Sequence, residues 1–114
     1  MIDRTYYHRM AQRNRLIPLR FKGKLKGLVT FYIANGNIEK FINRDPWHIV
    51  DDSPDGETVY IDQCVTNHAI SPLMSLSIYH NVIDYIKSEF PAVKYVRWNR
   101  WKNDKLNQYK RRIR

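Results

Sequence analysis

Apolar residues are most regularly spaced in the middle of the chain, across residues 57–90. Residues 58–66 are rich in β-branched, aromatic and small apolar side chains, which favours a strand. Residues 72–90 repeat apolar side chains at steps of three and four, which predicts a long helix with Ser71 as its N-cap and Pro91 beyond its end. A strand that turns directly into a helix places free helix N–H groups beside the strand end, and that corner suits an anion.

The N-terminal half predicts a hairpin. Residues 15–21 and 28–36 have the composition of strands, and the glycine-containing segment 22–27 between them predicts the turn. Pro18 favours an edge position or a bulge for the first of these strands, because proline cannot donate to a sheet ladder. The two strands are therefore expected to pair antiparallel.

The segments around the long helix complete the expected fold. Residues 93–98 predict a strand after a helical crossover, so parallel pairing with residues 58–66 is expected. The shorter elements expected are a helix at 3–13, a short helix or irregular crossover at 37–46, a short strand around Trp47, Ile49 and Val50, a turn at 51–56, a helix at 101–110, and a frayed end or edge strand at 111–114. This order predicts a single α+β domain over residues 1–114, with a mixed, mostly antiparallel sheet flanked by helices.

Composition limits the compartment and the chemistry. The sequence has no run of about 18 apolar residues and no apolar segment at its N-terminus, so neither a membrane span nor a secretory signal is expected. The single cysteine, Cys64, cannot form an internal disulfide and is expected to be a small core residue. A cytoplasmic protein is therefore expected. No metal site is expected, because His8, His48, His68 and His80 lack ligand-like spacing with carboxylates or Cys64.

The formal charge of +9 is spread unevenly. Residues 1–27 carry +7, residues 28–93 carry −6, and residues 94–114 carry +8. Two interpretations stay open: the basic ends fold against the acidic middle and partly neutralise it, or they form a surface that attracts polyanions.

Four stretches in this order resemble the GNAT N-acetyltransferase family. They are the hairpin FKGKLKGLVTFYI, the central strand VYIDQCVT, the long helix SPLMSLSIYHNVIDYIKSEFP, and the strand and "N…Y" helix of YVRWNR with NDKLNQYK. The resemblance covers about residues 15–110 and implies a GNAT-like α+β fold. The family's glycine-rich pyrophosphate turn, Q/R-x-x-G-x-G/A, is replaced here by Asn67-His68-Ala69-Ile70-Ser71-Pro72, which has no glycine and no arginine. The resemblance therefore supports the fold more than the activity.

The resemblance implies acetyl-CoA as the cofactor and assigns candidate residues to it. The backbone of Cys64, Val65 and Thr66 would follow the pantetheine arm. The implied contacts to the phosphates and the rest of the cofactor fall on Asn67, His68, Ala69, Ile70, Ser71 and Asn103. For His68, a solvated loop histidine is the alternative.

The resemblance also implies the residues that would move protons. Asp62 is the candidate base, directly or through water, with Glu57 as a weaker second candidate. Tyr109 matches the tyrosine that the family uses as an acid toward the leaving thiolate, although its offset from Asn103 is six residues instead of seven. The structural alternatives are an arginine-paired carboxylate for Asp62 and a packing aromatic for Tyr109.

A second function competes with this one. Residues 94–114 interleave aromatic rings with nine positive charges, a combination typical of nucleic-acid binding. In a strand at 95–100, alternation would place Tyr95, Arg97 and Asn99 on one face and Val96, Trp98 and Arg100 on the other, which makes Trp98 a core residue.

Two functions are therefore carried forward. The first is an acyl-CoA-dependent N-acetyltransferase, acting on an amine, with full, weak or lost activity. The alternative is a non-catalytic protein on a GNAT-like scaffold that binds nucleic acid or another polyanion through Lys110, Arg111 and Arg112. No membrane partner is expected, and the chain is expected to be a monomer or a homodimer. A chain this short and compact would also suit a phage or mobile-element protein.

Overall fold

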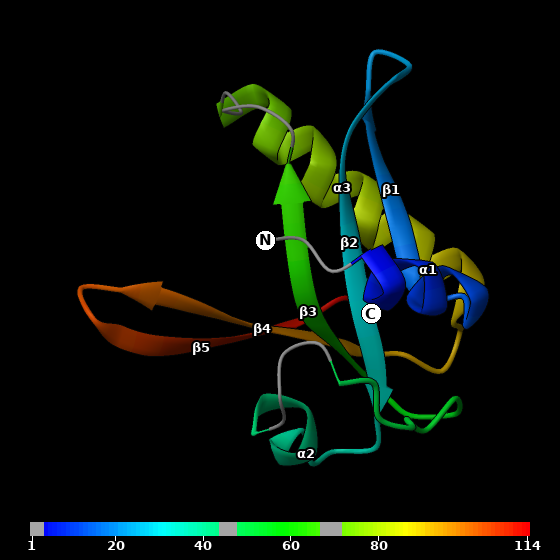
Figure 1. The fold of residues 1–114 in the computed structure, drawn as a ribbon, viewed down its shortest axis with the longest axis vertical. Helices are drawn as coiled ribbons and strands as arrows, with labels where there is room; N and C mark the ends of the chain where they lie inside the picture. Colours follow the sequence, from blue (N-terminus) through cyan, green and yellow to red (C-terminus); the bar gives the residue numbers. More distant parts are fainter. Residues whose placement is uncertain (1–3, 44–47, 67–71) are drawn as a thin grey trace.

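The computed structural model describes residues 4–43, 48–66 and 72–114. These residues form one five-stranded sheet in the order β1-β2-β3-β4-β5, with helices on both of its faces (Figure 1). The elements are α1 (Arg4–Gln12), β1 (Leu16–Phe21), β2 (Lys24–Ala34), α2 (Glu39–Ile42), β3 (Thr58–Thr66), α3 (Pro72–Glu89), β4 (Tyr95–Lys102) and β5 (Lys105–Arg112). None of the helices within these described ranges is both long and apolar enough to cross a membrane.

Strand directions confirm the mixed α+β sheet. β1 pairs antiparallel with β2, β2 with β3, and β4 with β5, whereas β3 and β4 pair in parallel across the α3 crossover. β1 lies at one edge, as Pro18 predicted, and its register shifts between Leu19 and Arg20. The β1–β2 turn is shorter than predicted: Lys22 and Gly23 have positive φ angles, and β2 begins directly after them.

The predicted helix at 101–110 is wrong. β4 continues to Lys102, and β5 returns along it from Lys105. Asn103 and Asp104 make the turn with φ angles of 52° and 61°, a left-handed conformation that Asn and Asp adopt more readily than most residues. Two such residues in succession match a tight hairpin connection, which joins antiparallel strands directly.

Two other predictions change. The short strand expected around Trp47 to Val50 is absent from its described part, because residues 48–50 are irregular. Residues 111–114 are an edge and not a frayed end: Arg111 and Arg112 belong to β5, and Ile113 is buried. The Arg114 guanidinium then donates to the carbonyls of Lys87 and Val93 at 2.8 and 2.7 Å, which holds the chain end against the end of α3.

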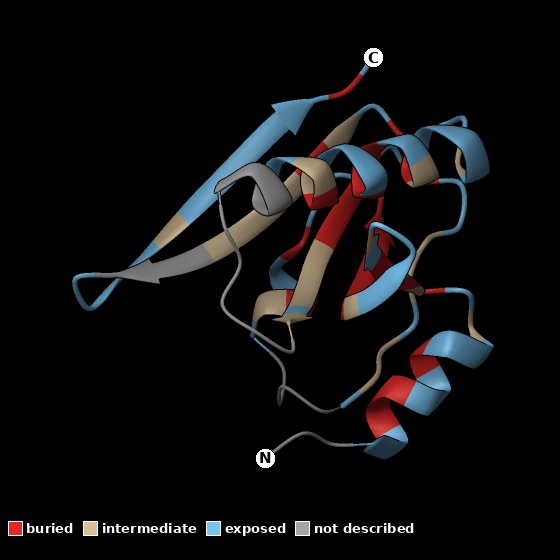
Figure 2. Ribbon diagram, turned by 90° about the horizontal axis from the view of Figure 1, so that it is seen from above, coloured by how far each residue is buried: buried red, intermediate tan, exposed pale blue. Residues whose placement is uncertain are grey.

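Each face of the sheet has its own core, because side chains alternate along the strands. Phe31 and Ile33 of β2 point toward α3, whereas Tyr32 and Ala34 point toward α1 and α2. The α3 face is built mainly from aliphatic side chains, and the opposite face is built around stacked aromatic rings such as Tyr32 and Phe41, whose centroids lie 4.6 Å apart. Figure 2 shows that burial is concentrated in the central strands, while the β4–β5 hairpin projects from the body and is largely exposed along β5.

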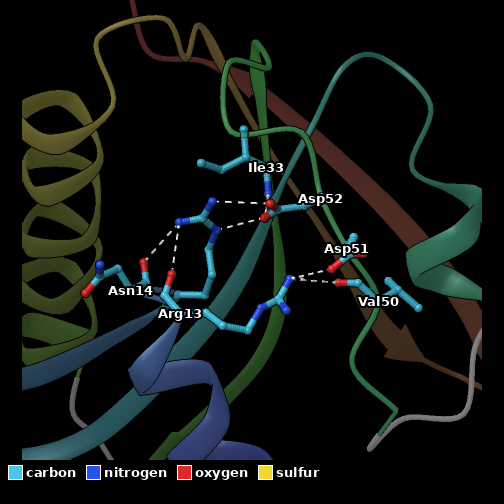
Figure 3. A network of polar contacts seen from close by, with 7 residues as sticks. Arg13, Asn14, Ile33, Val50, Asp51 and Asp52 are labelled. Atoms are coloured by element: carbon cyan, nitrogen blue, oxygen red, sulfur yellow. Dashed lines mark hydrogen bonds and ion pairs between the residues drawn. The ribbon is translucent and has the colours of Figure 1, made fainter.

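A buried ion pair fixes the segment before β3. The Arg15 Nε lies 2.8 Å from the Asp52 carboxylate, and their side chains are only 10% and 5% exposed. Asp52 also accepts a 2.9 Å hydrogen bond from the backbone N–H of Ile33 (Figure 3). The neighbouring pair, Arg13 and Asp51, is longer, at 3.4 Å, and its carboxylate is exposed. Asp52 therefore ties the loop before β3 to Arg15, which directly precedes β1, and to β2.

Candidate functional site

The two parallel strands at the centre of the sheet separate after three residues. Within the described chain, β3 pairs with β4 only where Thr58, Val59 and Tyr60 face Tyr95, Val96 and Arg97. β3 then stays with β2 as far as Thr66, and β4 stays with β5 as far as Lys102. Each strand keeps its antiparallel neighbour, so β3 and β4 diverge and leave a V-shaped opening between them.

A cavity of about 600 Å³ lies in this opening. Its walls come from β3, with Ile61, Asp62, Cys64 and Thr66, and from β4, with Val96, Trp98 and Asn99. Val29 of β2 and four α3 side chains, Ile78, Tyr79, Val82 and Ile83, complete the lining. The cavity is thus largely apolar toward α3 and polar where Asp62 and Asn99 meet it.

α3 places its first turn at the open end of the V. It begins at Pro72, and Figure 1 shows its N-terminal end near the C-terminal end of β3. The N–H groups of a helix's first turn have no partner within the helix, and they carry the positive end of its dipole. The predicted phosphate contacts Asn67, His68, Ala69, Ile70 and Ser71 lie outside the described residues.

Asp62 is the extra residue of a bulge in β3. Thr30 of β2 faces Gln63, and the next residue, Phe31, faces Ile61, so Asp62 has no residue opposite it in this ladder. A bulge interrupts strand pairing and re-aims a side chain, and bulges are frequent next to active sites. Asp62 is among the residues that line the cavity.

Tyr6 of α1 holds the Asp62 carboxylate from the other face of the sheet. The Tyr6 hydroxyl donates a hydrogen bond to Asp62 Oδ2 and lies 2.7 Å from Thr30 Oγ1. Because a phenol has a single hydrogen, Thr30 must be the donor in the second bond. The sequence analysis gave an arginine-paired carboxylate as the structural alternative for Asp62; one partner that the structure describes is a buried tyrosine, Tyr6.

Burial keeps the Tyr6 hydroxyl protonated. Desolvation, with the hydrogen bond to Asp62 next in size, raises the pKa of Tyr6 far above its ordinary value of 10.0. Desolvation also raises the pKa of Tyr7, to which the charges of Asp62 and Cys64 add. Tyr6 therefore stays a neutral phenol at physiological pH and can keep donating to the carboxylate.

Cys64 is not a core residue, and that prediction is wrong. Cys64 is exposed and lines the cavity, because the described pairing of β3 with β4 has already ended before this residue. The chain around its sulfur still raises the pKa of the Cys64 thiol by desolvation. Thr66 also lines the cavity, whereas Val65 packs against the core on the opposite face, so only its backbone can face the cavity.

Tyr109 and Asn103 lie outside the cavity lining. Tyr109 belongs to β5, directly opposite Trp98, and their rings stack with centroids 5.4 Å apart and an 11° interplanar angle. Trp98 in turn forms part of the cavity wall, so Tyr109 is one aromatic layer away from it. Asn103 lies at the turn between β4 and β5. Glu57 lies before β3, at its closed end, with its carboxylate 3.6 Å from Lys94 Nζ.

Two contributors to the site were missed from the sequence. Asn99 of β4 lines the cavity and donates a 3.3 Å hydrogen bond to the Tyr60 hydroxyl, which links β4 to β3 where the two strands begin to separate. Tyr6 reaches Asp62 across 56 residues, and local pattern carries no signal for such a contact. In the part of the chain that the structure describes, no three His, Cys, Asp or Glu side chains gather closely enough to hold a metal ion.

Comparisons with known proteins rest on the fold. No protein-family model matches the sequence, and no curated protein matches it. Among solved structures, the loading GNATL domain of CurA from Lyngbya majuscula superposes with a TM-score of 0.63 at 12% identity, covering 87% of this chain and 51% of that one. A protein from Staphylococcus aureus Mu50 assigned as an acetyltransferase superposes with a TM-score of 0.54 at 11% identity, covering 96% and 79%. The chain spans about half of the length of the CurA domain. These superpositions, with the split central pair of strands, show that the chain has a GNAT-like fold.

Proposed function

We propose that this protein is an acyl-CoA-dependent N-acetyltransferase that transfers an acetyl group to an amine. The observation that supports it is the opening between β3 and β4 beyond Tyr60, with its cavity of about 600 Å³. In the family that the sequence resembles, this is where the thioester carrier enters the sheet. Both solved structures described above share the fold, which favours the same use of the opening.

The residues of the cavity fit a slender chain that carries amides. Beyond Tyr60, the edge of β3 that faces β4 is unpaired in the described ladder, so backbone groups at Cys64 and Thr66 can bond an amide as an edge strand does. Val82 and Ile83 offer apolar contact on the α3 side. Phosphates would lie at the start of α3, where the helix dipole favours negative charge by about 0.3–1 kcal/mol.

Asp62 would act on the acceptor amine. Acetyl-CoA, when bound, supplies an activated acetyl group. An ammonium cannot attack it, so the amine must first lose a proton, and Asp62, a residue of the cavity lining, would take that proton directly or through water. Tyr6 fixes the carboxylate by donating to its Oδ2.

Tyr109 remains the proposed proton donor to the leaving thiolate. Its hydroxyl belongs to a ring that is 38% exposed and stacked on Trp98, which itself lines the cavity. From behind the Trp98 ring, the Tyr109 hydroxyl would deliver a proton through water. Tyr109→Phe tests this role, because it keeps the ring stacked on Trp98 and removes only the hydroxyl.

Calorimetric titration with acetyl-CoA tests the proposal most simply. Two variants at one position give a matched pair: Cys64→Trp fills the opening, and Cys64→Ser leaves it open. The wild-type chain and Cys64→Ser are expected to bind acetyl-CoA with the same affinity, and Cys64→Trp is expected to bind at least tenfold more weakly while unfolding at the same temperature. Absence of heat from the wild type at millimolar acetyl-CoA would overturn the proposal.

A further inference from the structure

The β4–β5 hairpin is a basic two-stranded ribbon that stands apart from the rest of the sheet. It leaves β3 after Arg97, and its outer strand, β5, is an exposed edge of the sheet (Figures 1 and 2). Residues 94–114 carry nine positive charges and a single acidic residue, Asp104, which lies in the turn. At the base of the hairpin, Glu57 is paired with Lys94.

Strand register sorts these charges onto two faces. Tyr95 lies opposite Arg112, and Arg97 lies opposite Lys110, so these four residues share the face that points away from α3. Arg111 lies opposite Val96 on the other face, where its guanidinium sits 5.3 Å from the Tyr79 ring of α3. The predicted trio of Lys110, Arg111 and Arg112 is thus divided, and the face away from α3 gains Arg97.

The shared face is ordered around one ring. Lys110 Nζ lies 4.3 Å from the Tyr95 ring centroid, and Arg112 Cζ lies 5.8 Å from it. Arg97 donates a 3.3 Å hydrogen bond to Gln108, which lies on the same face. Because Lys110 and Arg112 pack on the Tyr95 ring, the ring positions these two cations and is poorly suited to stacking a nucleic-acid base. The face therefore suits phosphates.

We propose that this face, with Arg97, Lys110 and Arg112, binds the phosphate backbone of double-stranded DNA. Alternate residues of a strand lie about 6.6–6.8 Å apart, which places the three cations close together against a duplex that carries one negative charge per about 1.7 Å. The major groove of B-form DNA, about 12 Å wide, admits a two-stranded β-ribbon. The narrow major groove of A-form RNA does not admit side chains for readout.

Fluorescence anisotropy with a labelled 20-base-pair DNA duplex, over 50–200 mM NaCl, tests this proposal. The test variant is Lys110→Gln with Arg112→Gln. The matched control is Lys105→Gln with Arg111→Gln, which removes the same charge from the same strand on the opposite face. Each lost phosphate contact reduces the slope of log affinity against log salt concentration by about 0.9. Between 50 and 200 mM NaCl, the affinity of the wild type should therefore fall by a factor roughly ten times larger than the affinity of the test variant.

The control variant is expected to keep the wild-type slope, and thermal unfolding checks that both variants fold. Equal loss in the two variants would overturn the proposal, because it would show an effect of net charge alone. So would tighter binding of single-stranded RNA or polyglutamate than of the duplex, or no binding of the duplex by the wild type at 50 mM salt.

Discussion

The Tyr6 hydroxyl of α1 donates a hydrogen bond to Asp62, the bulged residue of β3. The contact joins the aromatic core on one face of the sheet to the opening between β3 and β4. The bond fixes the orientation of the Asp62 carboxylate just beyond the point where β3 separates from β4. Several expectations depend on this bond.

Replacing Tyr6 with Phe removes the donor and keeps the ring. Thr30 and Asp62 both lose a partner, so the free energy of unfolding should fall by about 1–3 kcal/mol. In a reaction that uses Asp62, kcat should fall while the KM for acetyl-CoA stays the same. Steady-state kinetics and denaturant unfolding measure the two effects. A change in KM alone would show that Tyr6 does not position the base.

Alkaline pH should destabilise the chain through the same residue. The folded state raises the pKa of Tyr6 above its ordinary value of 10.0, so above that pH the unfolded chain loses a proton that the folded chain keeps. The free energy of unfolding should therefore fall by about 1.4 kcal/mol per pH unit above 10 from this group, and should be unaffected by it below that pH. Tyr6→Phe should flatten the decline by that amount in denaturant titrations between pH 9 and 11. Parallel curves for the two chains would contradict this assignment.

Asp62→Asn tests the base without changing the shape of the side chain. Acetyl transfer should fall by about 10²–10⁴-fold, since general base catalysis contributes on that scale. Calorimetry should find acetyl-CoA binding unchanged, because the residue acts on the acceptor. Glu57→Gln is the matched control: its carboxylate lies at the closed end of the strands, and activity should stay at the wild-type level. Full activity in Asp62→Asn would exclude it as the base.

Two neighbouring ion pairs should differ sharply in their effect on stability. Asp52→Ala leaves Arg15 buried without its partner and should cost about 3–5 kcal/mol of unfolding free energy. Asp51→Ala removes an exposed partner of Arg13 and should cost under about 1 kcal/mol. Chemical denaturation measures both. Similar losses from the two variants would show that burial does not distinguish the pairs.

The order of the central elements could be predicted from the sequence because local pattern determines it. The β1–β2 hairpin, β3, α3 and the parallel return into β4 all follow from apolar spacing and from the crossover rule. The C-terminal hairpin could not, because its residues alternate weakly and their spacing also suits a helix. The turn at Asn103 and Asp104 decides between the two, and it requires two consecutive positive φ angles.

The site was predictable only in part. Asp62 and Cys64 could be placed on the central strand, but neither the bulge nor the separation of β3 from β4 has a signature in one sequence. The exposure of Cys64 follows from that separation. The bond from Tyr6 to Asp62 depends on tertiary packing between segments 56 residues apart.

The rate at which Cys64 is alkylated tests the central claim most directly. This thiol is the single cysteine of the chain, and it lines the opening that is proposed to hold the pantetheine arm. Mass spectrometry would follow its reaction with a maleimide at pH 8, with and without acetyl-CoA, and with adenosine 3′,5′-bisphosphate as a ligand that has phosphates and no arm. Acetyl-CoA should slow the reaction in a saturable way, and the bisphosphate should slow it far less. An alkylation rate that millimolar acetyl-CoA leaves unchanged would contradict the account.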